Sequence, residues 1–190
     1  MTKDTSRTGG YQQNIGTSRP SDEPQSDGPA LPFCGDFDIR IARDGTWYYR
    51  GSPIGRKALV KLFATVLRRD DSGEYWLVTP VERGRIVVDD APFTAVECTA
   101  TGSGMDQKLS FRTNLDDWVE AGPEHPIRVA LAPDTEEPSP YIEVRHRLEA
   151  LIVRSVYYQL VDLAVEHQVN GKDHLGLWSN GTFFPLGPVP

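Results

Sequence analysis

The stretch from residue 36 to residue 69 constrains the fold most, because a hairpin signal and a helix signal follow one another there directly. Apolar residues alternate with polar ones up to Ile41, and an aromatic run occupies residues 47–49. Asp44 and Gly45 stand between these two runs, and an Asp-Gly pair in that position favours the tight turn of a β-hairpin. The sequence therefore predicts two antiparallel strands on either side of Asp44 and Gly45.

A helix is expected after the second strand, over residues 56–69. Ser52 is suited to cap its first turn, and Pro53 fits a helical position that needs no backbone donor. Apolar residues then recur at helical spacing, which places them on one face that should pack on a sheet. The members of this face are Leu59, Leu62, Phe63 and Val66.

The charge of the chain is unevenly distributed, although its net value is only −7. Residues 34–69 carry 8 Lys and Arg against 3 Asp, whereas residues 70–143 carry 5 against 16 Asp and Glu. Nucleic-acid-binding proteins usually present a dominant basic surface, which this acidic chain lacks. The basic first part can therefore bind a small anion, or it can pair with the acidic middle of the chain.

The location and the metal content are predicted from what the sequence lacks. No run approaches the roughly 18–20 apolar residues of a membrane-spanning helix, and the first ten residues lack the apolar core of a secretion signal. The cysteines, Cys34 and Cys98, form no CxxC pair and no metal-spaced cluster. We expect a cytoplasmic protein without a membrane or nucleic-acid partner, and without a bound metal or cofactor.

Three segments are predicted along the chain. Residues 1–33 are polar and rich in Gly, Ser and Pro, which is typical of a disordered leader. Residues 34–132 are expected to form an α+β part that contains the hairpin, the helix and a β-meander. A proline-rich, acidic connector at 133–140 begins a C-terminal part, residues 133–190, which consists of a strand, a helix and a hairpin packed on the first part.

The later elements are less uniform in their signals. Residues 141–153 fit a long strand and also the start of a helix, whereas Ser155 is suited to cap a helix over 156–167. Asn180 and Gly181 predict a second hairpin. Further strands are expected at 75–78, 85–88, 93–100, 108–113, 118–119 and 127–131. The predicted core includes Phe63, Trp76, Val78, Leu160 and Trp178.

The chain resembles the DUF1285 family of bacterial proteins from about Cys34 to Gly187. The similarity rests on ordered segments that include CGDFDIRIARDGTWYYRGSPIGRKALVKLF, YWLVTPVERGRIVVDDAPF, FRTNLDDWVEAGPEHPIRV, PYIEVRHRLEALIVRSVYYQLVDLAVE and GLWSNGTFFPLG. Within the chain, a strand, an Arg-Ser-containing link, a helix and a Trp-bearing strand occur twice, and this weak internal echo suggests a structural duplication in which each unit offers one helix to a sheet. The resemblance implies an α+β fold of two similar small parts with repeated strand-helix-strand motifs and antiparallel sheets each covered by a helix. It also implies a role in signalling or ligand sensing, and it supplies no catalytic residue.

Two groups of polar residues are candidates for a ligand site. Basic residues along the first hairpin and the helix start can cradle a phosphate or carboxylate, or can form an exposed rim paired with Asp36 or Asp38. Other polar residues lie where strands meet turns, and binding residues concentrate at such positions. Together the two groups give the predicted ligand-binding residues Arg40, Arg50, Arg56, Glu82, Arg112, His125, Arg145 and Glu149.

The sequence favours a non-catalytic regulatory module that binds a small anionic ligand in a cleft between the two parts, near residues 133–140. The alternative is a small-molecule hydrolase in which Glu82 or Glu149 acts as a base with His125. The phosphate-loop, dinucleotide-binding and nucleophile-elbow patterns are all missing. A protein partner is expected instead if the basic part only pairs within the chain.

Overall fold

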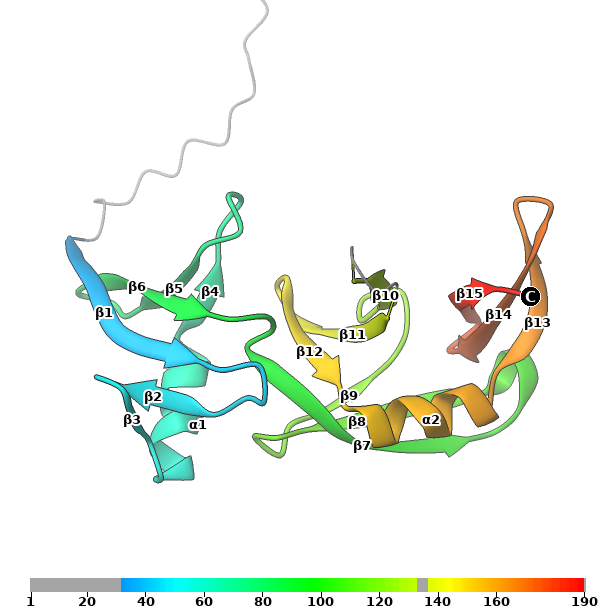
Figure 1. Ribbon diagram of the computed structural model, residues 1–190, viewed down its shortest axis with the longest axis horizontal. Helices are drawn as coiled ribbons and strands as arrows, with labels where there is room; N and C mark the ends of the chain where they lie inside the picture. The colour runs from blue at the N-terminus through cyan, green and yellow to red at the C-terminus, as the bar shows by residue number, and fades with distance from the viewer. Residues whose placement is uncertain (1–31, 133–136, 190) are drawn as a thin grey trace, which may run out of the picture. The chain divides into compact units, whose positions relative to one another are not determined.

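The computed structural model describes residues 32–132 and 137–189. The predicted leader lies outside the described residues up to residue 31, as does part of the predicted connector, residues 133–136. Strands dominate the described chain, and two α-helices accompany them, so the class is a mixed α+β fold that is mostly β (Figure 1). No helix in the described part of the chain is long and apolar enough to span a membrane.

The first sheet has six strands, and one helix interrupts them (Figure 1). Its strand order is β3-β2-β1-β6-β5-β4, so that β1 and β6 lie side by side in the centre and run parallel. All other neighbouring strands in this sheet are antiparallel. The elements are β1 (Phe33–Ile41), β2 (Trp47–Tyr49), β3 (Ser52–Pro53), α1 (Lys57–Thr65), β4 (Leu67–Arg69), β5 (Tyr75–Val78) and β6 (Arg83–Val88).

The predicted first hairpin is confirmed, since Ile41 pairs with Trp47 at its closed end. The connecting loop spans residues 42–46, and the Asp44 carboxylate accepts a hydrogen bond of 2.9 Å from the Thr46 backbone N–H. Gly45 has a φ of +82°, a conformation that costs glycine little and other residues more.

The predicted helix over 56–69 is shorter in the structure, and its capping was wrong. Ser52 and Pro53 form β3 and pair with Tyr49 and Tyr48, so they are not available to begin a helix. Arg56 is the N-cap residue of α1, without a side-chain cap. Residues 67–69 leave the helix because β4 pairs there with β5.

The buried face of α1 also differs from the prediction. Val60 and Ala64 are buried, at 6% and 3% exposure, whereas Leu62 is 61% exposed. Leu59, Phe63 and Val66 are half-buried. The helix therefore turns the Val60 side toward the sheet, and Leu62 was wrongly assigned to the core.

The second sheet repeats the strand order of the first. Its order is β10-β11-β12-β7-β8-β9, so two three-stranded meanders again meet in a parallel pair, here β12 and β7. The sequence predicted antiparallel sheets, and the two six-stranded sheets differ from this prediction at one strand pair each, β1–β6 and β12–β7, which are parallel. The elements are β7 (Phe93–Thr101), the short 3-10 helix η1 (Gly104–Asp106), β8 (Lys108–Thr113), β9 (Trp118–Glu120), β10 (Ile127–Leu131), β11 (Pro138–Arg145) and β12 (Leu148–Ile152).

The second sheet continues across the predicted connector. β10 and β11 are neighbours, and Leu131 pairs with Pro138, so the expected boundary at residue 133 lies between two paired strands of one sheet. The ambiguous segment 141–153 contributes parts of β11 and β12, which form a hairpin. His146 and Arg147 make its turn with φ values of +45° and +66°. Neither residue gives the Gly or Asn signal that predicts such a turn.

The chain ends with a helix and a three-stranded antiparallel sheet: α2 (Arg154–Asp162), β13 (Val165–Val169), β14 (Lys172–Ser179) and β15 (Thr182–Pro188). The Asn180-Gly181 hairpin is confirmed by pairing of Ser179 with Thr182. The second helix begins at Arg154 and not after Ser155, and it ends before β13, which occupies much of its predicted second half. α2 lies along β7 (Figure 1), and Val156 and Leu160 on it are buried.

The core joins residues from both six-stranded sheets, both helices and the last sheet. Of the predicted core residues, Leu160 is fully buried, whereas Phe63, Trp76, Val78 and Trp178 are half-buried. That a helix covers each sheet stays a prediction. Among the largest fully buried side chains are Trp47, Phe93, Phe111, Ile41, Leu67, Leu109 and Leu160.

Candidate functional site

A pocket of about 490 Å³ opens at the start of α2. The turn between β1 and β2, the first residues of β11, the end of β12 and the first turns of α2 supply its walls. We call it the α2 pocket. Its lining residues are Arg43, Glu137, Pro138, Ser139, Pro140, Leu151, Ile152, Val153, Arg154, Tyr157 and Tyr158.

Arg43 reaches the α2 pocket from the first sheet. Its Nε lies 3.2 Å from Asp90 Oδ2, and its Nη2 donates a hydrogen bond of 3.2 Å to Ser139 Oγ. These contacts orient the guanidinium, although the side chain remains 65% exposed. The guanidinium of Arg43, a residue of the β1–β2 turn, therefore lies beside the beginning of β11.

Arg154 supplies a second guanidinium as the first residue of α2. Its Nη2 donates to Glu137 Oε1 at 2.6 Å, and the side chain is 71% exposed. The first turn of α2 has no acidic residue and no side-chain cap. Because the first backbone N–H groups of a helix lack intrahelical acceptors, the start of α2 adds positive partial charge to the arginine.

Two tyrosines complete the polar lining of the α2 pocket. Tyr157 is half-buried, and this burial raises the pKa of its phenol above the ordinary value. The hydroxyl therefore stays protonated near neutral pH and can donate a hydrogen bond. Tyr158 is exposed and offers an aromatic face at the pocket.

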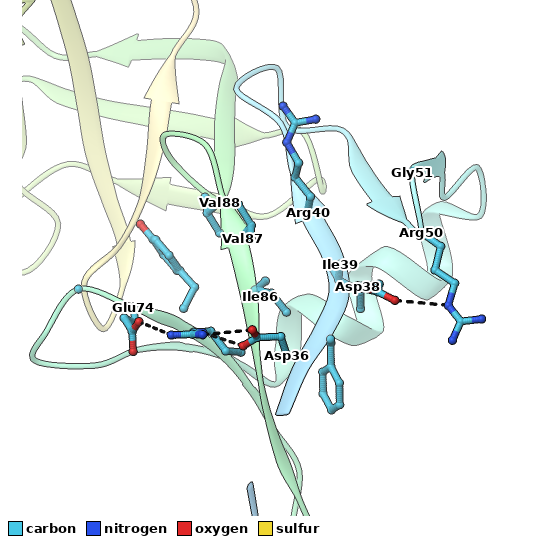
Figure 2. A pocket seen from close by; sticks show the side chains of 14 residues that line it. Asp36, Asp38, Ile39, Arg40, Arg50, Gly51, Glu74, Ile86, Val87 and Val88 are labelled. Atoms are coloured by element: carbon cyan, nitrogen blue, oxygen red, sulfur yellow. Dashed lines mark hydrogen bonds and ion pairs between the residues drawn. The ribbon is translucent and has the colours of Figure 1, made fainter. Parts of the chain in front are cut away.

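A larger pocket, of about 830 Å³, lies along β1 and β6 and has a balanced charge (Figure 2). We call it the outer pocket. Arg40, Arg50 and Arg85 line it together with three carboxylates, those of Asp36, Asp38 and Glu74. By contrast, the described residues that line the α2 pocket include two arginines and a single carboxylate, Glu137, so this described part of the lining carries a net positive charge.

The arginines of the outer pocket are all engaged in ion pairs. Arg85 contacts Asp36 at 2.7 Å and Glu74 at 2.8 Å, and it holds the pKa of the Asp36 carboxyl below its usual value. Arg40 pairs with Asp89, and Arg50 lies 3.6 Å from Asp38. The predicted basic rim, paired with Asp36 or Asp38, is thus partly present, with Arg85 and not Arg40 on Asp36.

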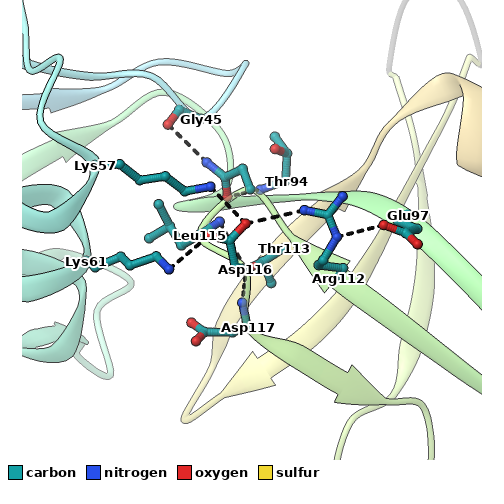
Figure 3. A network of polar contacts seen from close by, with 11 residues as sticks. Gly45, Lys57, Lys61, Thr94, Glu97, Arg112, Thr113, Leu115, Asp116 and Asp117 are labelled. Carbon is teal, nitrogen blue, oxygen red and sulfur yellow. Dashed lines mark hydrogen bonds and ion pairs between the residues drawn. The ribbon is translucent and has the colours of Figure 1, made fainter.

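Arg112, another predicted ligand residue, belongs to a polar network that joins the two sheets (Figure 3). It contacts Glu97 at 2.7 Å and Asp116 at 3.3 Å. Asp116 also receives Lys57 and Lys61 of α1, each at 2.8 Å. Lys57 foremost, and then Lys61, hold the pKa of the Asp116 carboxyl at about 2.

The other predicted residues are dispersed over the structure. Arg56 is exposed at the start of α1. Arg145 donates to the Ala64 carbonyl oxygen at 2.8 Å and lies over the Phe93 ring. Glu82 lines a pocket beside α1, away from the α2 pocket. The structure therefore does not gather the eight predicted residues into one site.

The contacts of His125 and Glu149 do not form one of the two acid–base pairs that the hydrolase alternative offers. His125 Nδ1 lies 3.1 Å from the carbonyl oxygen of Glu143. The Glu149 carboxylate accepts two hydrogen bonds from Arg128, of which the one from Nη2 is 2.7 Å long. In the described part of the chain, no group of three or more His, Cys, Asp or Glu side chains is placed to hold a metal ion.

The sequence interpretation missed Arg154, Tyr157 and Tyr158 as pocket residues. It placed Arg43 among the basic residues that can cradle an anion along the first hairpin and the helix start. The one available signal was position, because Arg154 stands just before the predicted helix and two Tyr lie in its first turn. That Arg43 and the helix start line one pocket depends on the packing of distant segments, which local patterns do not reveal.

The chain matches two family models over most of its length. The model described as "Domain of unknown function (DUF1285), N-terminal domain" covers residues 29–91, and "Protein of unknown function (DUF1285), C-terminal domain" covers residues 92–186. The division between them falls just before β7, where the second sheet begins. A search of curated proteins gave no match.

Two solved structures are similar to the chain. A DUF1285 family protein from Silicibacter pomeroyi DSS-3 is 49% identical, with a TM-score of 0.77, and the match covers 87% of this chain and 91% of that one. A DUF1285 family protein from Shewanella baltica OS155 is 28% identical, with a TM-score of 0.52, and the match covers 66% of this chain and 91% of that one.

Proposed function

Because the chain belongs to the DUF1285 family, whose two domains are described as having unknown function, we propose its role from its own residues: it is a cytoplasmic regulatory module that binds a small anionic ligand in the α2 pocket. One observation carries the proposal. Arg43 and Arg154 come from different family domains and line the same small pocket, and Glu137 is the single carboxylate among its described lining residues.

The two arginines retain hydrogen-bonding capacity for a ligand. A guanidinium has five N–H donors, and the contacts described above use two on Arg43 and one on Arg154. Arginine suits planar or tetrahedral oxyanions because it can donate two parallel hydrogen bonds. A phosphate or carboxylate between Arg43 and Arg154 would also face the first turn of α2, which has no acidic residue.

The size and lining of the α2 pocket fit a small metabolite. Its volume of about 490 Å³ lies within the roughly 300–1,000 Å³ typical of small-molecule sites. Tyr157 and Tyr158 can contact an apolar or aromatic portion of the ligand, while the arginines fix its charged group. Since the pocket takes residues from both family domains, a bound ligand would stabilise the contact between them, which is how a ligand sensor could transmit occupancy.

A thermal-shift screen of anionic metabolites tests the proposal. A ligand that binds only the folded protein stabilises it by RT ln(1 + [L]/Kd), about 2.7 kcal/mol at a hundredfold excess over Kd. We expect phosphorylated or carboxylated compounds to raise the melting temperature, and Arg43→Ala and Arg154→Ala to abolish the rise. Arg56→Ala is the matched control, because it removes the same charge from an exposed position outside the α2 pocket.

The same screen separates the alternatives. If Arg56→Ala or Arg112→Ala removes the shift while the α2-pocket variants retain it, the ligand site lies at one of the residues first predicted from the sequence. Mass spectrometry of each stabilising compound after incubation distinguishes a sensor from an enzyme. Conversion of the compound would support the hydrolase alternative and contradict the regulatory one.

A further inference from the structure

A third pocket, mostly apolar, lies between β1, the β2–β3 turn and α1. It has a volume of about 560 Å³ and shares no residue with the α2 pocket, whereas five of its lining residues, four on β1 and Arg50, also line the outer pocket. We call it the β1–α1 pocket. Its apolar lining residues are Phe37, Ile39, Tyr49, Ile54, Leu59, Phe63, Val66 and Leu77, and its polar ones are Asp36, Asp38, Arg50, Thr79 and Glu82.

The apolar walls of this pocket are incompletely buried. Phe37, Ile54, Leu59, Phe63 and Val66 are all half-buried, although they line one hollow. Apolar surface gathered around a concave site is typical of ligand pockets, because a ligand completes its removal from water.

Two of the apolar walls are held in place from behind. The Phe63 ring stacks on buried Trp47, with 6.3 Å between the ring centroids. The Phe37 ring lies against Gly84, so closely that a Cβ there would be 2.4 Å from its atoms. The Phe63 and Phe37 rings that line the pocket are therefore each packed against another residue of the fold.

A pair of opposite charges, Arg50 and Asp38, lines both this pocket and the outer pocket, in which Figure 2 shows the pair. Arg50 Nε is 3.6 Å from Asp38 Oδ2, and the two side chains are 71% and 69% exposed. The Arg50 guanidinium also lies over the Tyr49 ring, 5.2 Å from its centroid. An ion pair this exposed contributes little to stability, so both charges are available to a ligand at small cost.

The backbone of Arg50 is unusual for its residue type. Arg50 has a φ of +49° and is followed by Gly51 at +77°, in the tight turn between β2 and β3. Asn or Gly is the preferred residue at such a position, and a long side chain there is less stable. An arginine at this turn places its guanidinium beside the pocket, which Asn or Gly would not do.

The charges around the pocket indicate what polar group it accepts. Arg50 is the single basic side chain among the described residues that line it, and its guanidinium can bind a carboxylate. Three carboxylates, those of Asp36, Asp38 and Glu82, line the same pocket and favour a cationic group beside it. Asp36 is held by Arg85, which leaves Asp38 as the carboxylate adjacent to Arg50.

We propose that the β1–α1 pocket binds a small zwitterion with an apolar side chain, such as a free aromatic or branched amino acid. The side chain of the ligand occupies the apolar hollow between Phe37, Leu59 and Phe63. Its carboxylate contacts Arg50, and its ammonium group contacts Asp38. The ion pair between Arg50 and Asp38 is thereby replaced by two ion pairs with the ligand.

Calorimetric titration of the full chain with L-leucine, L-phenylalanine and L-tryptophan tests the ligand class. We expect saturable binding of at least one of them. The matched probes for phenylalanine are phenethylamine, which lacks the carboxylate, 3-phenylpropanoate, which lacks the ammonium group, and L-serine, which lacks the apolar side chain. Each should bind about tenfold or more weakly, because each loses a charge-assisted hydrogen bond or the apolar contact. Failure of all three amino acids to bind, or equal binding of the matched probes, would overturn the proposal.

The variant Arg50→Asn tests the residue assignment without a folding defect. Asn is well accommodated at positive φ, so the melting temperature should be unchanged or raised, while amino-acid affinity falls about tenfold or more. Arg147→Asn is the matched control, since Arg147 is also an exposed arginine at positive φ, in a hairpin turn outside the pocket. Retention of amino-acid binding by Arg50→Asn, or an equal loss in Arg147→Asn, would contradict the assignment.

Discussion

The Phe37 ring lies over Gly84, on the strand that runs parallel to its own. The register of β1 and β6 shifts between Asp36 and Arg40, and Phe37 stands within that irregular stretch. An added Cβ at Gly84 would approach three ring atoms of Phe37 to 2.4–2.5 Å. One glycine therefore permits the close approach on which both the central strand pair and a wall of the β1–α1 pocket depend.

We expect Gly84→Ala to lower the free energy of unfolding by about 1–3 kcal/mol, the usual cost of overpacking a well-filled site. Gly55→Ala is the control, because no atom lies within 4 Å of the corresponding Cβ position. Urea denaturation of both variants measures the difference. Equal stability of the two would show that Phe37 does not pack on Gly84.

The Asp116 carboxylate forms ion pairs with Lys57, Lys61 and Arg112. Its backbone has a φ of +67°, a conformation that Asn also tolerates. The folded-state pKa of about 2 is below the unfolded value of about 3.9. The ion pairs therefore contribute stability that is present above about pH 4 and is lost as the pH falls toward 2. Screening by salt should reduce this contribution, since the groups are exposed.

Asp116→Asn should consequently destabilise the protein more at pH 5 than at pH 2. Denaturant unfolding of the wild type and the variant at several pH values in this range gives the comparison. Asp106→Asn is the control, because it changes an exposed carboxylate in η1. The difference in stability between wild type and this variant should not become smaller at low pH. If the free energies of unfolding of wild type and Asp116→Asn differ by the same amount at every pH, the ion pairs of Asp116 are not the cause of that difference.

Among the elements, α1 has a different buried face from the one that its apolar spacing predicts. The helix has nine residues, and strands border it on both sides. Over so short a length, apolar residues at 59, 60, 62, 63 and 66 fit more than one face, and only the position of the sheet selects between them. The structure selects Val60 and Ala64.

Val60→Asp and Leu62→Asp distinguish the two faces. Val60→Asp puts an unpaired charge into the core and should cost more than about 3 kcal/mol or prevent folding. Leu62→Asp should change stability by no more than about 0.5 kcal/mol, because the side chain is exposed. Thermal denaturation of the purified variants, with yield of folded protein, is the measurement. Greater destabilisation by Leu62→Asp than by Val60→Asp would instead support the buried face of α1 that was predicted from the sequence.

Local turn chemistry explains which elements the sequence could predict. Asp44-Gly45 and Asn180-Gly181 specify hairpins through their own conformational preferences, and both hairpins are confirmed. The His146-Arg147 turn has the same kind of backbone without those residue types, so the β11–β12 hairpin was ambiguous between strand and helix. The end of each helix was set too late because a paired strand competes for the same residues, and strand pairing is not a local property.

At the scale of the whole molecule, both six-stranded sheets use the same strand order, with two meanders that meet in a central parallel pair. The internal echo in the sequence suggested duplication but matched helix-containing segments, whereas the structural repeat is between β1–β6 and β7–β12. Parallel pairing of β1 with β6 and of β7 with β12 joins residues 47–57 positions apart. The candidate site likewise combines distant segments, since Arg43 and Arg154 are far apart in the sequence and line one pocket.

The most direct test of the proposed function is an NMR titration of the 15N-labelled full chain with the anionic metabolite that stabilises it most. The account predicts saturable shifts at Arg43 and Ser139 and at the first two turns of α2, and their loss in Arg154→Ala. Shifts confined to the start of α1 or to the outer pocket, or shifts that do not saturate, would contradict the assignment of the α2 pocket as the ligand site.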